Sequence, residues 1–188
     1  MLNWHIRQAV RIIKAGGVIA YPTEAIFGLG CDPLNPYAIE KLLTLKQRDI
    51  NKGLLLIATN IEQIRPYVDQ LDASMVKKIL GPGVQPITWL IKANPSVPYW
   101  LRGNHLIIGI RIIHHLIATA ICTCLNQPII STSANISHRP PAKRRIMVHK
   151  YFHGLVDDIV SGSLGKYAAP SEIRDIVTDQ VIRSGNPL

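Results

Sequence analysis

The fold is decided by the stretch Pro22-Thr23-Glu24-Ala25-Ile26-Phe27-Gly28-Leu29-Gly30-Cys31-Asp32. The apolar run Val18-Ile19-Ala20-Tyr21 comes directly before it, between a glycine pair and Pro22, as is typical of a short buried strand. This strand would place Thr23 at its C-terminal end, where ligands commonly bind in α/β folds. The glycines at 28 and 30 do not open a helix, so they do not match the Gly-x-Gly-x-x-Gly turn of dinucleotide-binding proteins.

Helices are predicted on both sides of this stretch. Apolar residues recur at helical spacing between Trp4 and Ala15, and Gly16-Gly17 provides a natural C-terminal stop. On the other side, Asn35-Pro36 is typical of an N-cap followed by proline in the first turn, and this helix is expected to extend to Lys46. The expected order is therefore helix, strand, loop, helix.

The rest of the chain alternates between strand and helix patterns. Strands are predicted at residues 54–58, 87–91, 107–113, 128–131, 159–160, 173–177 and 181–183, and helices at 61–80, with a break at Pro66, and at 115–125. The most polar segment, 137–145, is expected to form a mobile loop. This mixture predicts a single α/β domain over residues 1–188, with a twisted mixed sheet flanked by helices.

The positive charge of the chain is unevenly distributed. The formal net charge is +9, yet the segment from Ala73 to Val156 has no Asp or Glu and carries ten of the Lys and Arg residues. The remainder is close to neutral. Such a segment favours anionic partners, either nucleotide phosphates or RNA, although a solvated basic surface is the simpler explanation for any single lysine.

Several classes of protein are excluded. No apolar run approaches the roughly 20 residues of a membrane helix and the N-terminus lacks the apolar region of a signal peptide, so we expect a cytoplasmic protein with no membrane partner. Three cysteines do not make a disulfide scaffold, and Cys122 with Cys124 is a weak candidate for a metal site. The sequence has neither the Gly-x-Ser-x-Gly nucleophile elbow of hydrolases nor the His-Glu-x-x-His pattern of zinc proteases, and no metal-ligating residues are predicted.

Hydroxyl side chains and cations stand at the ends of several predicted strands. Thr23, Thr88, Arg111 and the run Ser131-Thr132-Ser133-Ala134-Asn135 are positions of this kind. In open α/β sheets the crevice beyond the strand ends is the usual ligand site, so we expect these positions to converge there.

Three further cations, Lys46, Arg48 and Lys52, fall within seven residues at the end of the predicted 36–46 helix. Such a cluster suits a polyphosphate better than a single carboxylate. The alternative is a favourable placement of cations at a helix C-terminus, and the cluster alone does not separate the two.

Taken in order, these motifs resemble those of the YrdC-type threonylcarbamoyl-AMP synthases over almost the whole chain. The matching pieces are Pro22-Thr23-Glu24 with Phe27-Gly28-Leu29-Gly30, Lys46-x-Arg48 with Lys52, the Pro82-Gly83 region leading to Thr88, Arg111 followed by His114, Ser131-Thr132-Ser133-Ala134-Asn135, Pro170-Ser171-Glu172-Ile173-Arg174-Asp175 and Val181-Ile182-Arg183-Ser184-Gly185. Each piece is modest alone, but their joint order and spacing are highly specific.

The resemblance implies a YrdC-like fold with a concave basic cleft, and it implies a reaction. L-threonine, bicarbonate and ATP would give threonylcarbamoyl-AMP and pyrophosphate, with magnesium usually assisting. Downstream threonylcarbamoyl-transferase proteins would then modify the adenosine beside the anticodon of certain tRNAs. The implied catalytic residues are Lys46, Arg48, Lys52, Ser133 and Asn135; Thr23, Thr88 and Arg111 would bind substrate, and Ser131 and Arg183 would contact the nucleotide.

The chemistry of this reaction suits these residue types. Every reacting species is anionic, so cations and hydroxyl donors should outnumber acids in the site, and no covalent protein nucleophile is needed. Glu24 is the sole acid of the matched core motifs, and we interpret it as structural rather than as a general base.

The chain departs from the family pattern in places, and other functions stay open. Phe27 stands where the family commonly has Tyr, Ala25 where Thr is common, and the usual Pro-Gly-Pro before Thr88 is missing. The main alternative is a factor without synthase activity that binds tRNA or double-stranded RNA through the acid-free segment. Another alternative is a carbamoyl-adenylate enzyme that acts on a different amino acid. Four basic residues outside the motifs could contact RNA in either case: Arg139, Lys143, Arg144 and Arg145.

Overall fold

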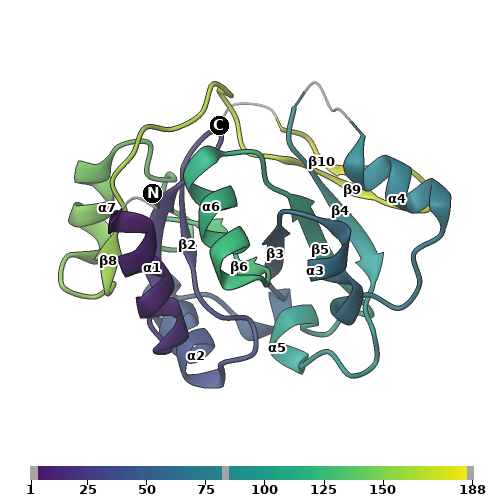
Figure 1. Ribbon diagram of the computed structural model, residues 1–188, viewed down its shortest axis with the longest axis horizontal. Helices are drawn as coiled ribbons and strands as arrows, with labels where there is room; N and C mark the ends of the chain where they lie inside the picture. Colours follow the sequence, from purple (N-terminus) through teal and green to yellow (C-terminus); the bar gives the residue numbers. More distant parts are fainter. Residues whose placement is uncertain (1–3, 82–84, 186–188) are drawn as a thin grey trace.

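The computed structural model describes residues 4–81 and 85–185, and the Pro82-Gly83 motif lies outside these ranges. It is a mixed α/β fold, as predicted, but the strands form two sheets flanked by helices (Figure 1). The first sheet has the order β7-β2-β1-β8 and the second the order β10-β9-β4-β5-β3-β6.

The first sheet contains the stretch quoted at the outset. Its strands are β1 (Ile19–Pro22), β2 (Phe27–Gly30), β7 (Thr132–Ser133) and β8 (Asp158–Ile159). Strand β2 pairs antiparallel with β1, so the expected loop after Pro22 is wrong: the chain turns back at once as a hairpin. All four residues of β2 are buried, and β2 pairs with β1 and with β7, which explains why the glycine-rich run still forms a strand.

The second sheet supplies most of the predicted strands. It contains β3 (Leu55–Ala58), β4 (Ile87–Lys92), β5 (Ile107–Ile112), β6 (Ile129–Ile130), β9 (Glu172–Asp175) and β10 (Val181–Arg183). Strand β5 lies between β3, its parallel neighbour, and β4, its antiparallel neighbour. This register places Ile57 and Arg111 side by side, and it aligns Leu55 and Leu90 with Gly109.

The helices cover the sheets on several sides. They are α1 (Trp4–Lys14), α2 (Pro36–Lys46), α3 (Ile61–Ile64), α4 (Ala73–Leu80), α5 (Tyr99–Arg102), α6 (Leu116–Leu125) and α7 (Arg145–Phe152), with 3-10 turns η1 (Ile50–Lys52) and η2 (Arg65–Tyr67). Asn35 caps α2 as predicted, because its side chain accepts the N–H groups of Tyr37 and Ala38. Neither α5 nor α7 was expected: α5 is a single turn, and α7 begins at the last residue of the predicted 137–145 loop.

The apolar core lies on both faces of β1, as a fully buried strand requires. Ile19 and Tyr21 pack with α1 and α6, which lie against each other (Figure 1). Ala20, on the opposite face, belongs to the larger core that includes Leu42 of α2. Strand β1 is therefore held from both sides, and this fixes the position of Thr23 just beyond its end. In the described part of the chain, no helix has the length and apolar character to cross a membrane.

Candidate active site

A cavity of about 1050 Å³ opens between the two sheets. Nine of the ten predicted site residues line it, and only Lys46 does not. Among the described lining residues, six are Lys or Arg and two are acidic, namely Glu24 and Asp175. The expected convergence on one cleft is therefore found, and the lining is rich in cations; the roles of the individual residues remain predictions.

Strand β5 runs along the cavity floor. Its alternate residues Ile107, Gly109 and Arg111 face the cavity, as the two-residue period of a strand requires. Thr88 and Leu90 of β4 line it in the same way. Gly109 keeps the floor flat, because a Cβ there would lie 3.2 Å from Leu55 Cβ and 3.4 Å from Thr88 Cγ2.

At the Arg111 end of this floor lie Thr23 and Glu24, directly after β1. Thr23 Oγ1 donates to the carbonyl of Ile26 at 2.8 Å, which fixes the tight turn into β2. Glu24 Oε1 accepts the N–H of His114 at 3.2 Å, and its Oε2 lies 3.7 Å from Nη2 of Arg111. These contacts agree with a structural role for Glu24.

This buried pair is not fully satisfied. Glu24 Oε2 and Arg111 Nε are buried, and neither has a hydrogen-bond partner among the described residues. Both residues line the cavity. Because unpaired buried polar atoms are costly, a polar ligand at this wall would gain by supplying partners.

Ser131 lies beside this wall, at the end of β6, and is buried. Its Oγ accepts a hydrogen bond of 2.8 Å from the hydroxyl of Tyr21, which the sequence did not single out. The ring of Tyr21 passes over β2 where side chains are absent: a Cβ on Gly30 would lie 2.8 Å from Tyr21 Cε1. Gly28 and Gly30 therefore leave room for the ring of Tyr21, and they do not form a phosphate-binding loop.

Lys46 lies beneath the cavity wall and is 2% exposed. Its ammonium donates to the carbonyl oxygens of Ser133 and Asn135, and it also reaches Asn135 Oδ1 at 3.3 Å. Ser133 Oγ donates to the same Oδ1 at 2.6 Å. Burial lowers the pKa of Lys46 to about 7, and the charge of Arg48 adds to this effect. Lys46 thus holds the two cavity-lining residues Ser133 and Asn135 in place.

Arg48 and Lys52 reach the cavity from the segment after α2. Arg48 Nη2 donates to the carbonyl of Gly53 at 3.0 Å, while its buried Nε has no partner among the described residues. Burial and the neighbouring charge of Arg183 lower the pKa of Arg48. Lys52 is exposed, and its ammonium makes no hydrogen bond or ion pair with another described residue. Cations held close together in this way favour an anionic ligand.

Arg183 comes from the hairpin of β9 and β10. Its Nη2 donates to the carbonyl of Ser171 at 2.9 Å, and Ser171 Oγ lies 2.9 Å from Thr88 Oγ1. These contacts join the hairpin to β4 at the cavity wall. Ser171 is buried and lines the cavity, so it belongs to the candidate site although it had no predicted role beyond the motif that contains it.

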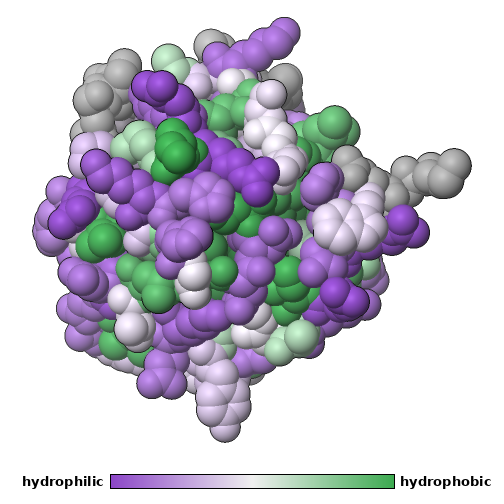
Figure 2. Space-filling model, turned by 90° about the vertical axis from the view of Figure 1, so that its left-hand side faces the viewer, coloured by the Kyte–Doolittle hydropathy of each residue, from purple (hydrophilic) through white to green (hydrophobic). Residues whose placement is uncertain are grey.

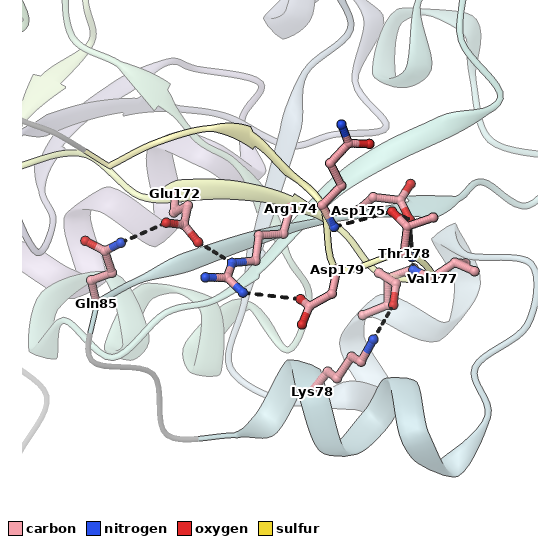
Figure 3. Close-up of polar contacts among 10 residues, drawn as sticks. Lys78, Gln85, Glu172, Arg174, Asp175, Val177, Thr178 and Asp179 are labelled. Carbon is pink, nitrogen blue, oxygen red and sulfur yellow. Dashed lines mark hydrogen bonds and ion pairs between the residues drawn. The ribbon is translucent and has the colours of Figure 1, made fainter.

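Polar contacts away from the cavity hold the same hairpin (Figure 3). Glu172 accepts from Gln85 at 3.1 Å and pairs with Arg174, which also contacts Asp179 at 3.4 Å. Lys78 of α4 donates to the carbonyl of Ile176 at 2.9 Å (Figure 3). The hairpin is thus attached to α4 and to the segment before β4, and its position supports that of Arg183.

Arg102, at the end of α5, and His105, three residues later, line the cavity although the sequence analysis gave neither of them a role. They lie in the acid-free segment, and this was the only signal that could have drawn attention to them. The described residues contain no group of three or more His, Cys, Asp or Glu side chains that could hold a metal ion.

The chain is similar to known proteins both in sequence and in fold. The family model Sua5/YciO/YrdC, described as telomere recombination, matches residues 11–185. The threonylcarbamoyl-AMP synthase of Nitrosococcus oceani is 46% identical over 181 residues, which cover 96% of this chain and 98% of that protein. The enzyme of the same name from Cellvibrio japonicus is 41% identical over 97% of this chain and 96% of its own length.

Solved structures show the same fold. The Sua5 of P. abyssi complexed with L-threonine superposes with a TM-score of 0.83 and 28% identity over 92% of this chain. The match covers 51% of that Sua5 chain, so the present chain spans about half of its length. YciO of E. coli gives a TM-score of 0.80 and 28% identity, over 97% of this chain and 90% of YciO.

Proposed function

Because the chain belongs to the Sua5/YciO/YrdC family, we propose that it is a threonylcarbamoyl-AMP synthase, an enzyme of the nucleotidyltransferase class. The observation that carries the proposal is the cavity, because nine of the ten predicted site residues line it, and four of these nine are Lys or Arg. A plain RNA-binding surface does not require Thr23, Ser133 and Asn135 to lie beside those cations. The relatives' names also favour a synthase over an RNA-binding factor without activity.

The proposed reaction joins three substrates without a covalent enzyme intermediate. Bicarbonate loses hydroxide to give carbon dioxide, and the amine of L-threonine attacks this carbon dioxide to form a carbamate. The proton that the amine releases combines with the hydroxide, so water is the by-product. A carbamate oxygen then attacks the α-phosphorus of ATP, the bond from that phosphorus to the bridging oxygen breaks, and pyrophosphate leaves with the electron pair. Since nucleophile, substrate and leaving group are all anions, the main tasks of the protein are alignment and charge screening.

The residues of the cavity divide these tasks by position. Thr23, with Thr88 and Arg111, would seat threonine at one end, where buried polar atoms lack partners. Ser131 and Arg183 would contact the nucleotide. The phosphates would be bound by Arg48, Lys52, Ser133 and Asn135. Lys46 would contribute indirectly, because its ammonium holds Ser133 and Asn135 in position through their carbonyl oxygens.

The residues do not fit a magnesium ion held by protein carboxylates. Glu24 faces Arg111, and Asp175 Oδ1 accepts the N–H groups of Val177 and Thr178. Magnesium prefers carboxylate oxygens together with substrate phosphates. The ion expected from the resemblance would therefore have its ligands on the phosphates of ATP.

We further propose that residues 1–188 form one domain, because residues of both sheets line the cavity. The cytoplasmic location stays a prediction from the sequence. The product would pass to a threonylcarbamoyl-transferase, and tRNA would be the final acceptor. Direct contact with tRNA or double-stranded RNA would use Arg139, Lys143, Arg144 and Arg145, of which the last begins α7. The end of the molecule that carries α7 is largely hydrophilic (Figure 2). A tRNA affinity that falls steeply with salt would support this contact.

Pyrophosphate release tests the proposal. The purified chain is given ATP with threonine and bicarbonate, added singly and together, and the adenylate product is identified by mass. We expect release only when both co-substrates are present. Release that ignores either co-substrate would contradict the proposal, and a preference for another amino acid in a panel that includes serine would change the substrate.

A further inference from the structure

One end of the cavity is lined by two cations, Lys52 and Arg102, together with His105. We propose that Arg102 and His105 are further substrate-binding residues, which hold the pyrophosphate portion of ATP and the pyrophosphate that leaves. The inference rests on the proposed function, because that reaction supplies the ligand.

The end of the cavity that Lys52, Arg102 and His105 line lies opposite the end where threonine is proposed to bind, as strand β5 shows. Arg111 lies beside Glu24 at one end of the floor, and Ile107 lies four residues away at the other. At about 3.3 Å per residue this is roughly 13 Å. His105 precedes Ile107 by two residues and Arg102 by five, and all three line the cavity.

Two chain segments are locked together to build this end. Leu54 donates its N–H to the carbonyl of Leu101 at 2.9 Å, and Asn104 donates to the carbonyl of Asn51 at 3.2 Å. Gly103, with φ +61°, passes so close to Asn51 that a Cβ would lie 2.1 Å from its carbonyl oxygen. Only glycine tolerates this crossing, which brings the residues next to Lys52 and Arg102 into backbone contact.

The Arg102 side chain is itself held in place. Its guanidinium lies 5.9 Å from the centre of the Tyr99 ring, and its Nη1 donates to the carbonyl of His105 at 3.2 Å. The Tyr99 hydroxyl contacts Asn51 and Asn104, so the ring is fixed to both segments. These contacts leave the remaining N–H groups of the guanidinium for a ligand.

Acidic side chains do not offset these cations. Glu24 lines the far end of the cavity and faces Arg111. Asp175 lines the middle, in register with Leu90, and is engaged by Val177 and Thr178. Asp49, which is near Lys52 in sequence, accepts the N–H of Asn51 at 2.9 Å.

The geometry of phosphoryl transfer makes this end suitable for the leaving group. The attacking and leaving oxygens lie roughly in line on opposite sides of the phosphorus. If the carbamate forms at the Thr23 end, pyrophosphate departs toward the opposite end of the cavity. There it meets three basic side chains, and Arg102 presents the planar donor array that suits phosphate oxygens.

Calorimetric titration of the full chain with pyrophosphate, and separately with AMP, tests the inference. We expect Arg102→Gln to weaken pyrophosphate binding by roughly tenfold and to leave AMP binding within about twofold, since AMP lacks the β- and γ-phosphates that leave as pyrophosphate. Arg102→Lys keeps the charge but not the planar donor array, so it should retain only part of the affinity and bind more weakly than the wild type. Arg7→Gln is the matched control: it removes an exposed arginine of α1 outside the cavity and should change neither affinity.

The outcomes separate this inference from the proposed function. Unchanged pyrophosphate binding in Arg102→Gln, or equal loss for AMP, would overturn the inference even in an active synthase. A chain that binds pyrophosphate but makes no adenylate would overturn the proposed function and, with it, the identity of the ligand. Should Arg102→Gln fail to fold by circular dichroism, His105→Gln serves instead, because His105 is exposed; we expect roughly a threefold weakening.

Discussion

The hydroxyl of Tyr21 donates a hydrogen bond of 2.8 Å to Ser131 Oγ, and both residues are buried. Burial raises the pKa of Tyr21, so the phenol stays protonated and remains the donor. A serine hydroxyl carries one proton, and because Ser131 Oγ accepts from Tyr21, that proton is available to a ligand in the cavity. Tyr21 is therefore a positioning residue for the candidate nucleotide contact.

Replacing Tyr21 with phenylalanine should impair binding more than folding. The ring still fills the space above Gly28 and Gly30, but Ser131 loses its donor and its hydroxyl is free to rotate. We expect a loss of about 1 kcal/mol in the free energy of unfolding and a rise in the KM for ATP of roughly fivefold. Urea denaturation and steady-state kinetics measure the two quantities.

A double-mutant cycle with Ser131→Ala gives the control. If Tyr21 acts through Ser131, the KM effects of the two substitutions should not add, with a coupling of about 0.5–1.5 kcal/mol. Strictly additive effects would show that Tyr21 influences the site by another route.

Lys52→Ala should separate catalysis from stability. The side chain is exposed and has no partner among the described residues, so its loss should change the free energy of unfolding by no more than about 0.5 kcal/mol. If Lys52 screens the phosphates, kcat/KM should fall by about 100-fold or more. Lys150→Ala, which removes an exposed cation of α7, is the control. Full activity of Lys52→Ala would remove Lys52 from the site.

Local signals were sufficient for much of the fold. Asn35-Pro36 predicted the start of α2 because a cap and a first-turn proline act within a few residues. Strand β2 was missed for the opposite reason. Its sequence Phe27-Gly28-Leu29-Gly30 has low strand propensity, and it is a strand because β1 and β7 pair with it on either side.

The site divides in the same way. Hydroxyls and cations at strand ends predicted that Thr23, Thr88, Arg111 and the 131–135 run converge, and residues from all four do line one cavity. Arg48 and Lys52 were drawn in by the cluster at the end of a helix, and Arg183 by the family resemblance alone. The sequence could not show that Lys46 lies beneath the wall, because its burial depends on Ser133 and Asn135, nearly ninety residues away. Tyr21 was missed because the sequence shows only an ordinary residue of an apolar strand. Arg102 was missed because it lies in a segment with no predicted element, and its partners are known only from the structure.

The depressed pKa of Lys46 predicts a pH-dependent stability. With a pKa of about 7 in the folded chain and 10.5 as the ordinary value, the unfolded chain binds more protons between these limits. The free energy of unfolding therefore rises with pH across this window, by at most about 1.4 kcal/mol per pH unit. This gain from the neutral form of Lys46 is lost as the pH falls through 7. Urea denaturation of the wild type and of Lys46→Met from pH 6 to 9.5 measures the difference. The exposed variant Lys150→Met should give a curve parallel to the wild type.

The buried pair of Glu24 and Arg111 predicts a variant that depends on anions. Glu24→Gln keeps the shape of the side chain and the acceptor for His114. It removes the negative charge beside the guanidinium of Arg111, a residue that is only 7% exposed. We expect the free energy of unfolding to fall by about 3 kcal/mol without ligand.

Anions should then restore what the substitution removes. The carboxylate of threonine, or sulfate, bound near Arg111 would replace the missing charge, so added anion should raise the melting temperature of Glu24→Gln more than that of the wild type. Glu62→Gln breaks an exposed pair with Arg65 and should cost no more than about 1 kcal/mol, with no added response to anions. Equal anion responses in all three proteins would mean that the Arg111 end of the cavity does not bind an anion, and threonine, with its carboxylate, would then have to be seated elsewhere.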